Sequence, residues 1–366
     1  MDTNSILFVV GARPNFVKIA PVCQALREQG GLSYQIAHTG QHYDRMMSGI
    51  FFEELAIPAP DFHLRAEGKT HARQTGEIMM KLEALCQAHT FTALVVIGDV
   101  NSTLAGALAG SKLQIPVAHI EAGLRSFNRC MPEEINRIAT DHISSLLFAP
   151  SHTAMANLKR EGLESRSCFS GDVMYDMILK GLKIAERQSS ILAELRLEPR
   201  GYYLATLHRP YNVDDGRQLR EIIAGLSRLE EKVILAAHPR LRKNLKRFGI
   251  VPGSNIQLSE PLGYLDFILL EKNAIKIVTD SGGIQKEAFF IGTPCVTLRP
   301  ETEWMETVAA GANILVKCRT ADAIARAVSC EKVPQYGNKP YGNGRAGEII
   351  VEALQARFCC RNTQTT

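Results

Sequence analysis

The feature that most constrains the fold of this chain is a regular alternation of short apolar runs with longer helical patterns. Each apolar run is bounded by glycine, proline or charged residues, as is typical of strands buried in a parallel sheet. The first series of runs is ILFVV, YQIAHT, ALVVIGD, PVAHIEAG and LLFAPS, and the second is YYLATLH, KVILAAH, IKIVTDS and PCVTLR. Strands that alternate with helices predict an α/β fold with two Rossmann-like, doubly wound sheets.

The length of 366 residues is too great for one core of ordinary size and suits two domains of ~150–200 residues each. We expect the boundary near Gly171, within FSGDVMYD. Residues 1–171 would then form the N-terminal domain and 172–345 the C-terminal domain, followed by a final helix and tail over 346–366.

Composition excludes several classes of function. The formal net charge is +4, from 42 basic and 38 acidic side chains, which gives no reason to expect nucleic acid as a partner. The nine cysteines are dispersed without a CxxC pair, which favours a reducing cytoplasm over a disulfide framework. The N-terminal apolar run is too short for a signal peptide, and no stretch approaches the ~20 apolar residues of a membrane helix. We therefore expect a cytoplasmic protein with no membrane partner.

A reactive or glycine-rich group follows nearly every predicted strand. In open parallel sheets, ligands bind in the crevice outside the carboxyl ends of the strands. Two such sheets facing each other would bring these groups into one cleft, where we expect the active site. The groups are Gly11-Ala12-Arg13, Asp99, Glu121, His208, His238, Asp280-Ser281-Gly282-Gly283 and Arg299.

The stretch TDSGGIQKEA has the character of a phosphate site. Ser281, Gly282 and Gly283 lie between a strand and a helix, where free N–H groups and the helix dipole attract phosphate. Glu287, about one turn into the helix, suits a ribose diol. The competing interpretation is a tight turn with a serine cap.

The stretch GARPNFVK offers a second phosphate contact. Arg13 and Lys18 follow the first strand and are suited to clamp a diphosphate. The alternative is a proline-initiated helix with a solvated arginine. No GxGxxG, GxxxxGK[ST] or GxSxG motif is present, and no metal-ligand spacing, so we expect neither a cofactor nor a metal.

Three carboxylates and two histidines are candidates for proton transfer. Asp99 and Glu121 end strands, and Glu121 in particular stands at the mouth of a strand predicted to be central. Glu133 has a structural alternative, because carboxylates favour a helix start and Glu133 is spaced to pair with Arg137. Asp99 has one as a turn cap. His208 and His238 suit proton transfer and diphosphate neutralisation, or a purely structural role.

Taken together, GARPNFVKIAPV, TGQHYDRM, IGDVNST, HIEAGLRS, MPEEINR, LHRPYN and TDSGGIQKEA resemble the non-hydrolysing UDP-N-acetylglucosamine 2-epimerases. The resemblance covers almost the whole chain in the right order. It implies two domains facing across a cleft in the GT-B arrangement, without NAD or an essential metal, a homodimer, and a final helix that packs back on the N-terminal domain. Other stretches, such as TEWMETV, are closest to a subgroup that includes epimerases of UDP-2,3-diacetamido-2,3-dideoxy-glucuronate.

The resemblance also implies a mechanism and assigns roles. UDP is eliminated anti to a C2 proton, giving a 2-acetamidoglucal, and then adds back while C2 is protonated on the other face. Asp99, Glu121 and Glu133 match the catalytic carboxylates, and which of them serves each face stays open. His208 matches the catalytic histidine that assists the departing UDP.

Binding roles follow from the same matches. The positions assigned to substrate or UDP are Arg13, Lys18, Arg209, His238, Phe267, Ser281, Gly282, Gly283, Glu287, Arg299 and Glu303, with Phe267 beside uracil. Residues matching a second, activating UDP-GlcNAc site are Gln41, His42, Arg73, Gln74 and Glu134, joined by His238. Asp44 departs from the glutamine common at its position in that site.

Three departures from the family pattern concern the sugar and the first loop. Asn15 stands where glutamate is frequent, HRPYN replaces HRREN, and Trp304 replaces an arginine near the expected sugar pocket. The sequence therefore predicts a cytoplasmic enzyme that converts UDP-GlcNAc to UDP-ManNAc, with the diacetamido uronate as the alternative substrate. A hydrolysing epimerase, a glycosyltransferase of the same fold and a non-catalytic nucleotide-sugar sensor remain as further alternatives.

Overall fold

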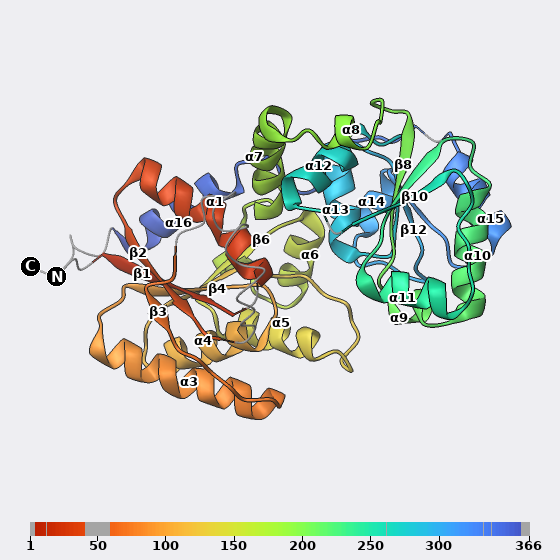
Figure 1. The fold of residues 1–366 in the computed structure, drawn as a ribbon. Helices are drawn as coiled ribbons and strands as arrows, with labels where there is room; N and C mark the ends of the chain where they lie inside the picture. Colours follow the sequence, from red (N-terminus) through yellow and green to blue (C-terminus); the bar gives the residue numbers. More distant parts are fainter. Residues whose placement is uncertain are drawn as a thin grey trace, which may run out of the picture. The chain divides into compact units, whose positions relative to one another are not determined.

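The computed structural model describes residues 4–11, 13–40, 59–260, 262–331, 333–337 and 339–359. It divides into two compact units, one formed by Met1–Met177 with Pro340–Thr366 and the other by Ile178–Lys339 (Figure 1). We call them unit 1 and unit 2. The division falls within helix α7 (Val173–Gln188).

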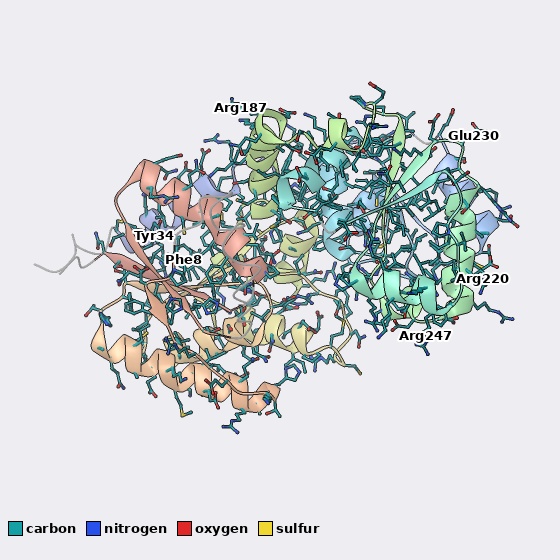
Figure 2. The ribbon with its side chains drawn as sticks, in the orientation of Figure 1. Phe8, Tyr34, Arg187, Arg220, Glu230 and Arg247 are labelled. Atoms are coloured by element: carbon teal, nitrogen blue, oxygen red, sulfur yellow. The ribbon has the colours of Figure 1, made fainter. Side chains whose placement is uncertain are left out.

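Unit 1 contains a parallel sheet whose described strands follow the order β3-β2-β1-β4-β5-β6-β7. The strands are β1 (Ser5–Val10), β2 (Ser33–His38), β3 (Phe62–His63), β4 (Ala93–Ile97), β5 (Val117–Ile120), β6 (Leu146–Ala149) and β7 (Ser167–Phe169). Every residue of β4 and β5 is buried, as expected for the centre of a sheet that is covered on both faces. At the β1–β2 pair, Phe8 and Tyr34 meet edge to face with ring centroids 5.9 Å apart (Figure 2).

Helices cover both faces of this sheet, with α1 and α16 on one side and α3 and α4 on the other (Figure 1). The helices of unit 1 are α1 (Arg13–Gln29), α3 (His71–Ala88), α4 (Asn101–Lys112), α5 (Pro132–Ile143), α6 (His152–Arg160), the short 3-10 helix η1 (Glu164–Arg166) and α16 (Ala346–Phe358). The apolar side chains of α3 and α4 form one core with β1, β4 and β5.

The final helix α16 returns to unit 1 and packs closely on α1. A Cβ atom on Gly347 would lie 2.7 Å from the carbonyl oxygen of Pro21, so only glycine permits this approach. Gln355 donates to the carbonyl of Gly30 at 2.7 Å, which fixes the other end of the helix. The Asp176 carboxylate accepts from the first N–H groups of α16.

Unit 2 repeats the architecture with a parallel sheet in the order β10-β9-β8-β11-β12-β13. Its strands are β8 (Tyr202–Thr206), β9 (Lys232–Ala236), β10 (Ile256–Ser259), β11 (Ile277–Thr279), β12 (Cys295–Thr297) and β13 (Asn313–Leu315). Its helices are α8 (Ile191–Glu194), α9 (Pro210–Val213), α10 (Gly216–Ser227), α11 (Pro239–Arg247), α12 (Tyr264–Asn273), α13 (Gly282–Ile291), α14 (Met305–Ala309) and α15 (Ala321–Ser329). Charged side chains such as Arg220, Glu230 and Arg247 lie on its exposed surface (Figure 2).

Both strand orders have the doubly wound pattern, so the predicted α/β fold is confirmed. In each sheet the order reverses at one point, between β1 and β4 in unit 1 and between β8 and β11 in unit 2. Ligands of such sheets bind at this switch point, outside the carboxyl ends of the strands. Of the helices that the structure describes, none combines the length and apolar character needed to cross a bilayer.

Candidate active site

Gly98 and Glu121 lie side by side at the carboxyl ends of β4 and β5, next to the switch point of unit 1. Strands β4 and β5 pair with Ile97 opposite Ile120, so the two residues that follow are neighbours at the strand ends. Both have left-handed backbone angles, with φ of 74° at Gly98 and 72° at Glu121. For a residue with a side chain this conformation costs energy and persists where the surrounding structure enforces it, often at functional sites.

Lys18 of α1 forms an ion pair with Glu121, whose side chain is only 5% exposed. A Cβ on Gly98 would lie 3.4 Å from Glu121 Oε2, 3.7 Å from Lys18 Nζ and 3.2 Å from Asn15 Nδ2, so the glycine makes room for this cluster. Burial lowers the pKa of Lys18, but attraction to Glu121 and Asp99 outweighs it and raises the pKa above its usual value. The site therefore keeps a cation beside a buried carboxylate.

Helix α5 holds Asp99, the residue after Gly98. Arg137 Nη2 lies 2.5 Å from Asp99 Oδ2. Asn136 Nδ2 donates to the backbone carbonyl of Asp99 at 2.9 Å. The Asp99 side chain remains 30% exposed, so its carboxylate is oriented by the helix and still reachable.

Two consecutive glutamates of α5 have different environments. Glu133 is exposed in the first turn. Glu134 is 1% exposed and accepts from the backbone N–H groups of Ser126 and Phe127 at 2.8 and 2.9 Å. Burial raises the pKa of Glu134, but these hydrogen bonds lower it below the usual value. Arg137 pairs with Glu134 at 3.1 Å as well as with Asp99, and among the described residues it forms no pair with Glu133.

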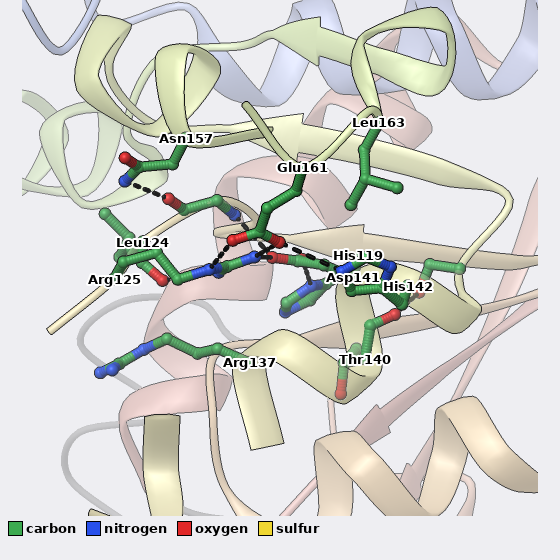
Figure 3. Close-up of polar contacts among 12 residues, drawn as sticks. His119, Leu124, Arg125, Arg137, Thr140, Asp141, His142, Asn157, Glu161 and Leu163 are labelled. Carbon is green, nitrogen blue, oxygen red and sulfur yellow. Dashed lines mark hydrogen bonds and ion pairs between the residues drawn. The ribbon is translucent and has the colours of Figure 1, made fainter. Parts of the chain in front are cut away.

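Behind the strand ends lies a buried polar network that the sequence analysis did not single out (Figure 3). His119 of β5 contacts Asp141 of α5 at 2.7 Å. Arg125 pairs with Asp141 at 2.7 Å and holds Glu161 with two hydrogen bonds of 2.7 Å. His142 Nε2 lies 3.2 Å from Glu161. The sequence did contain a signal for this network, namely His119 inside an otherwise apolar strand and Arg125 shortly after it.

At the switch point of unit 2, Asp280 orients His208. Asp280 is fully buried and lies 2.8 Å from His208 Nδ1. It also accepts from the backbone N–H groups of His208 and Arg209 and from Asn212 Nδ2. Burial raises the pKa of Asp280, but the hydrogen bonds from His208 and Asn212 lower it below the usual value. The His208 side chain is 49% exposed, so the ring is both fixed and accessible.

Polar and charged groups surround the first turn of α13. A Cβ on Gly282 would lie 3.6 Å from Arg299 Nη1, 3.7 Å from Trp304 Nε1 and 4.0 Å from Glu303 Oε2. Arg299 is buried and pairs with both oxygens of Glu303, at 3.0 and 2.9 Å. The Lys286 ammonium stands over the Trp304 ring, 4.3 Å from its centroid. Gly282, at the N-terminus of α13, therefore lies beside the Arg299–Glu303 ion pair.

Gln285 connects this turn to the segment that carries Glu303. It is fully buried, and its Oε1 accepts from Thr302 Oγ1 at 2.6 Å and from Asn313 Nδ2 at 3.1 Å. Its amide nitrogen donates to the carbonyl of Ser281 at 3.1 Å. One side chain therefore links the predicted phosphate turn to the neighbouring loop.

Glu287 lies further along α13, near a second buried carboxylate. Burial raises the pKa of Glu287 to about 7, while Lys286 acts in the opposite direction. Glu271 of α12 is fully buried, and burial together with Glu287 raises its pKa well above the usual value. Phe267 lies on the same helix, partly buried.

Other predicted site residues have more local roles. His238 is the N-cap of α11 and accepts from the Arg240 N–H. Arg209 donates to the Asp280 carbonyl at 3.4 Å. Arg13 begins α1, and its side chain lies outside the described part of the structure. Within the described ranges, no group of three or more His, Cys, Asp or Glu side chains is arranged to hold a metal ion.

The residues predicted for an activating site are only partly described. Gln41 and His42 lie outside the described residues. Arg73 pairs with Glu77 at 2.8 Å on the exposed side of α3. Gln74 accepts from Asn101 Nδ2 at 2.7 Å, and so lies next to the start of α4.

Comparison with known proteins gives consistent results along the whole chain. The family model described as UDP-N-acetylglucosamine 2-epimerase matches residues 24–355. A UDP-N-acetylglucosamine 2-epimerase homolog from Methanococcus maripaludis is 47% identical over 96% of this chain and 99% of its own length. A UDP-2,3-diacetamido-2,3-dideoxy-D-glucuronate 2-epimerase from Pseudomonas aeruginosa is 46% identical over 95% of this chain and 99% of its own length.

Solved structures agree with the sequence relatives. The crystal structure of Methanocaldococcus jannaschii UDP-GlcNAc 2-epimerase in complex with UDP-GlcNAc and UDP matches with a TM-score of 0.81 and 43% identity. The match covers 96% of this chain and 99% of that one. The resemblance inferred from the motifs is thereby confirmed. The chain belongs to the UDP-N-acetylglucosamine 2-epimerase family.

Proposed function

We propose that this enzyme inverts C2 of a UDP-N-acetylhexosamine without net hydrolysis, converting UDP-GlcNAc to UDP-ManNAc. The observation that carries the proposal is the arrangement at the switch point of unit 1. There, a buried Glu121 in a left-handed turn pairs with Lys18, next to an Asp99 that α5 holds in place. Family membership supports the same isomerase activity.

The proposed reaction consists of two balanced steps. A carboxylate removes the C2 proton, the C–H electron pair forms the C1–C2 double bond, and the C1–O bond breaks with its electrons leaving on UDP. UDP then adds back to C1 while a protonated carboxyl group delivers a proton to the other face of C2. No electrons are gained or lost overall, so the reaction requires no redox partner.

Unit 1 supplies the proton-transfer groups in this proposal. Asp99, Glu121 and Glu133 act on C2, one accepting the proton and another delivering it on the opposite face. Glu121 is buried beside a cation, Asp99 is partly exposed beside Arg137, and Glu133 is exposed.

Unit 2 supplies most of the residues for UDP, and Arg13 and Lys18 of unit 1 are assigned to the diphosphate. Asp280 fixes His208 through Nδ1, which leaves the ring's other nitrogen for the departing diphosphate. Gly282 offers its N–H at the start of α13, where no side chain that the structure describes caps the helix, and Arg299 lies beside it. The Ser281 N–H already donates to Thr279 Oγ1 at 3.0 Å, so Ser281 contributes its hydroxyl. Glu287 accepts hydrogen bonds from the ribose.

The same chemistry on UDP-2,3-diacetamido-2,3-dideoxy-glucuronate is equally supported. The Pseudomonas aeruginosa relative of that name is 46% identical to this chain. A uronate carries a carboxylate, and Lys286, buried on α13 with its ammonium over the Trp304 ring, provides a cationic group for it. We also propose that the enzyme is a cytoplasmic homodimer, on the family resemblance.

Each UDP-sugar, incubated with the enzyme in heavy water, tests the proposal by proton NMR. Loss of the C2 proton signal with appearance of the C2 epimer and little free sugar supports it, and the sugar that reacts identifies the substrate. Stoichiometric release of free sugar and UDP would instead show a hydrolysing enzyme. Inertness toward both sugars would contradict the proposal.

A further inference from the structure

His119 is fully buried between two hydrogen-bond acceptors. Its Nδ1 lies 2.7 Å from Asp141 Oδ1, and its Nε2 lies 2.8 Å from the backbone carbonyl oxygen of Gly98. No part of the ring is exposed to solvent. Figure 3 shows the imidazole approaching Asp141 within the buried network.

The acceptor at Nε2 is fixed, and the group that faces Nδ1 decides the charge of the ring. A carbonyl oxygen has no hydrogen to give, so Nε2 carries one toward Gly98. Asp141 Oδ2 accepts from the Gly123 N–H at 3.0 Å and pairs with the buried Arg125 guanidinium at 2.7 Å, and a buried cation of this kind favours a carboxylate over a neutral acid. Burial raises the pKa of Asp141, but His119 and Arg125 lower it below the usual value. Nδ1 then carries the second hydrogen, and the ring is an imidazolium.

The charges of the network balance around this ring. The imidazolium and Arg125 are cations, and Asp141 and Glu161 are the anions that contact them. The side chains of His119, Arg125 and Asp141 are at most 1% exposed. A buried ion is tolerated when it is paired and hydrogen-bonded in this way, and losing one partner leaves an uncompensated charge.

The carbonyl that His119 holds belongs to the peptide group between Gly98 and Asp99. Gly98 has a φ of 74°, which places this peptide in an orientation that the sheet alone does not fix. Asn136 and Arg137 hold the next residue, through its backbone and its carboxylate. His119 also precedes Glu121 by two positions on β5, so one ring ties the ends of both strands together.

We propose that His119 is a charged positioning residue, an imidazolium that fixes the Gly98–Asp99 peptide and thereby the Asp99 carboxylate. It touches no substrate. Its effect on turnover rests on the proposed epimerase function, whereas its charge state does not. Asp141 is the counter-ion that maintains the charge.

The charge state is tested on the whole protein by NMR with 15N-labelled histidine at pH 7. We expect the two ring nitrogens of His119 both to carry a proton, and the signals to be assigned by their loss in His119→Gln. In Asp141→Asn the counter-ion is absent, so one nitrogen should lose its proton. A wild-type ring with one proton-free nitrogen would overturn the assignment. If His119→Gln fails to fold, the histidine signals that change in Asp141→Asn identify the His119 ring.

Kinetics test the positioning role separately. A glutamine has one donor group for two acceptors, so His119→Gln should lower kcat by about 10- to 100-fold through misplacement of Asp99. KM and UDP affinity should stay within about twofold, because the substrate-binding residues of unit 2 are untouched. His142→Gln is the matched control, since His142 contacts the outer end of the network and should change kcat less than about twofold.

The outcomes separate the two claims. A folded His119→Gln with wild-type kcat would overturn the positioning role. Equal losses of kcat in His119→Gln and His142→Gln would show that both substitutions act through general stability, and would also overturn the positioning role. If wild-type protein epimerises neither UDP-sugar, the proposed function fails, and the NMR result still decides the charge of His119.

Discussion

At the scale of single residues, the proposed role of Glu121 in proton transfer rests on its ion pair with Lys18. Glu121 is buried and held in a left-handed turn, next to a cation that favours its ionised form. An ionised carboxylate accepts a proton, whereas the neutral amide of glutamine is unable to. The ion pair therefore favours an ionised carboxylate on a residue that the backbone holds in a left-handed conformation.

We predict that Glu121→Gln lowers kcat by about 10²- to 10⁴-fold, the range typical of losing a general acid–base group. UDP affinity should change far less, because among the residues assigned to substrate or UDP only Arg13 and Lys18 lie in unit 1. Turnover by NMR and UDP binding by calorimetry measure the two effects. Glu28→Gln, an exposed carboxylate on α1, should behave as wild type. Near-normal turnover in Glu121→Gln would remove Glu121 from the catalytic set.

Glu287 gives a residue-scale prediction about pH. Burial raises its pKa to about 7. Below that pH it is protonated and has reduced capacity as an acceptor, and above it the carboxylate accepts from both ribose hydroxyls. UDP should therefore bind more tightly as pH rises from 6 to 8, by about 3- to 10-fold relative to Glu287→Gln. If the UDP affinities of wild type and Glu287→Gln change with pH in the same way, the proposed contact of Glu287 with the ribose is contradicted.

At the scale of elements, the arrangement of side chains at the ends of β4 and β5 depends on Gly98. Gly98 has a φ of 74°, and a Cβ there would also meet Glu121 and Asn15. Gly249 offers a matched comparison, because it has a φ of 61° and nothing lies within 4 Å of the Cβ position. An alanine at Gly98 would therefore combine backbone strain with crowding of Glu121 and Asn15, whereas an alanine at Gly249 would have backbone strain alone.

Gly98→Ala and Gly249→Ala should each lower the free energy of unfolding by about 1–2 kcal/mol, the usual cost of a left-handed alanine. Only Gly98→Ala should also lower kcat, by about tenfold or more, since it displaces Glu121. Denaturant unfolding and turnover assays measure both quantities. Equal kcat in the two variants would show that the space at Gly98 has no catalytic role.

The start of α16 supplies a second element-scale prediction. Asp176 accepts from the N–H groups of Ala346 and Gly347 at 3.1 and 2.8 Å. Burial nevertheless raises its pKa to about 6, from an ordinary value of 3.8. The folded state then holds more protons than the unfolded state between these values, so the free energy of unfolding falls as pH rises through this window.

Asp176→Asn removes this ionisation while keeping one acceptor for α16. Relative to wild type, the variant should therefore gain about 1–3 kcal/mol in free energy of unfolding between pH 4 and pH 7. Urea denaturation at several pH values measures the difference. Glu352→Gln, an exposed carboxylate on the same helix, should follow the wild-type curve. If the free energies of unfolding of Asp176→Asn and wild type differ by the same amount at every pH, the argument that burial raises the pKa of Asp176 is contradicted.

At the scale of the whole molecule, the sequence predicted the doubly wound sheets because buried parallel strands leave a strong local signal. Asp99 and Glu121 are brought together as expected, since β4 and β5 are adjacent and their ends are in register. The pairing of Lys18 with Glu121 was not predicted, because its motif equally suits a diphosphate contact. Which side chain a lysine reaches depends on packing that no local pattern encodes.

The supporting residues were the least predictable part. The sequence predicted Asp280 only as a group at a strand end. In the structure its carboxylate contacts the His208 ring and accepts from the Arg209 N–H and from Asn212 Nδ2. His119 and Asp141 are 22 residues apart in sequence, and although His119 opens the motif HIEAGLRS, nothing in that motif indicates its contact with Asp141. Their roles emerge only from the distances between their atoms.

The most direct test of the account is proton NMR of the enzyme with UDP-GlcNAc, and separately with the diacetamido uronate, in heavy water without added cofactor. We predict exchange of the C2 proton for deuterium in one of these sugars, with its C2 epimer accumulating and little free sugar. Epimer that forms with its C2 proton retained, or a complete lack of reaction with both sugars, would contradict elimination and re-addition of UDP at this site.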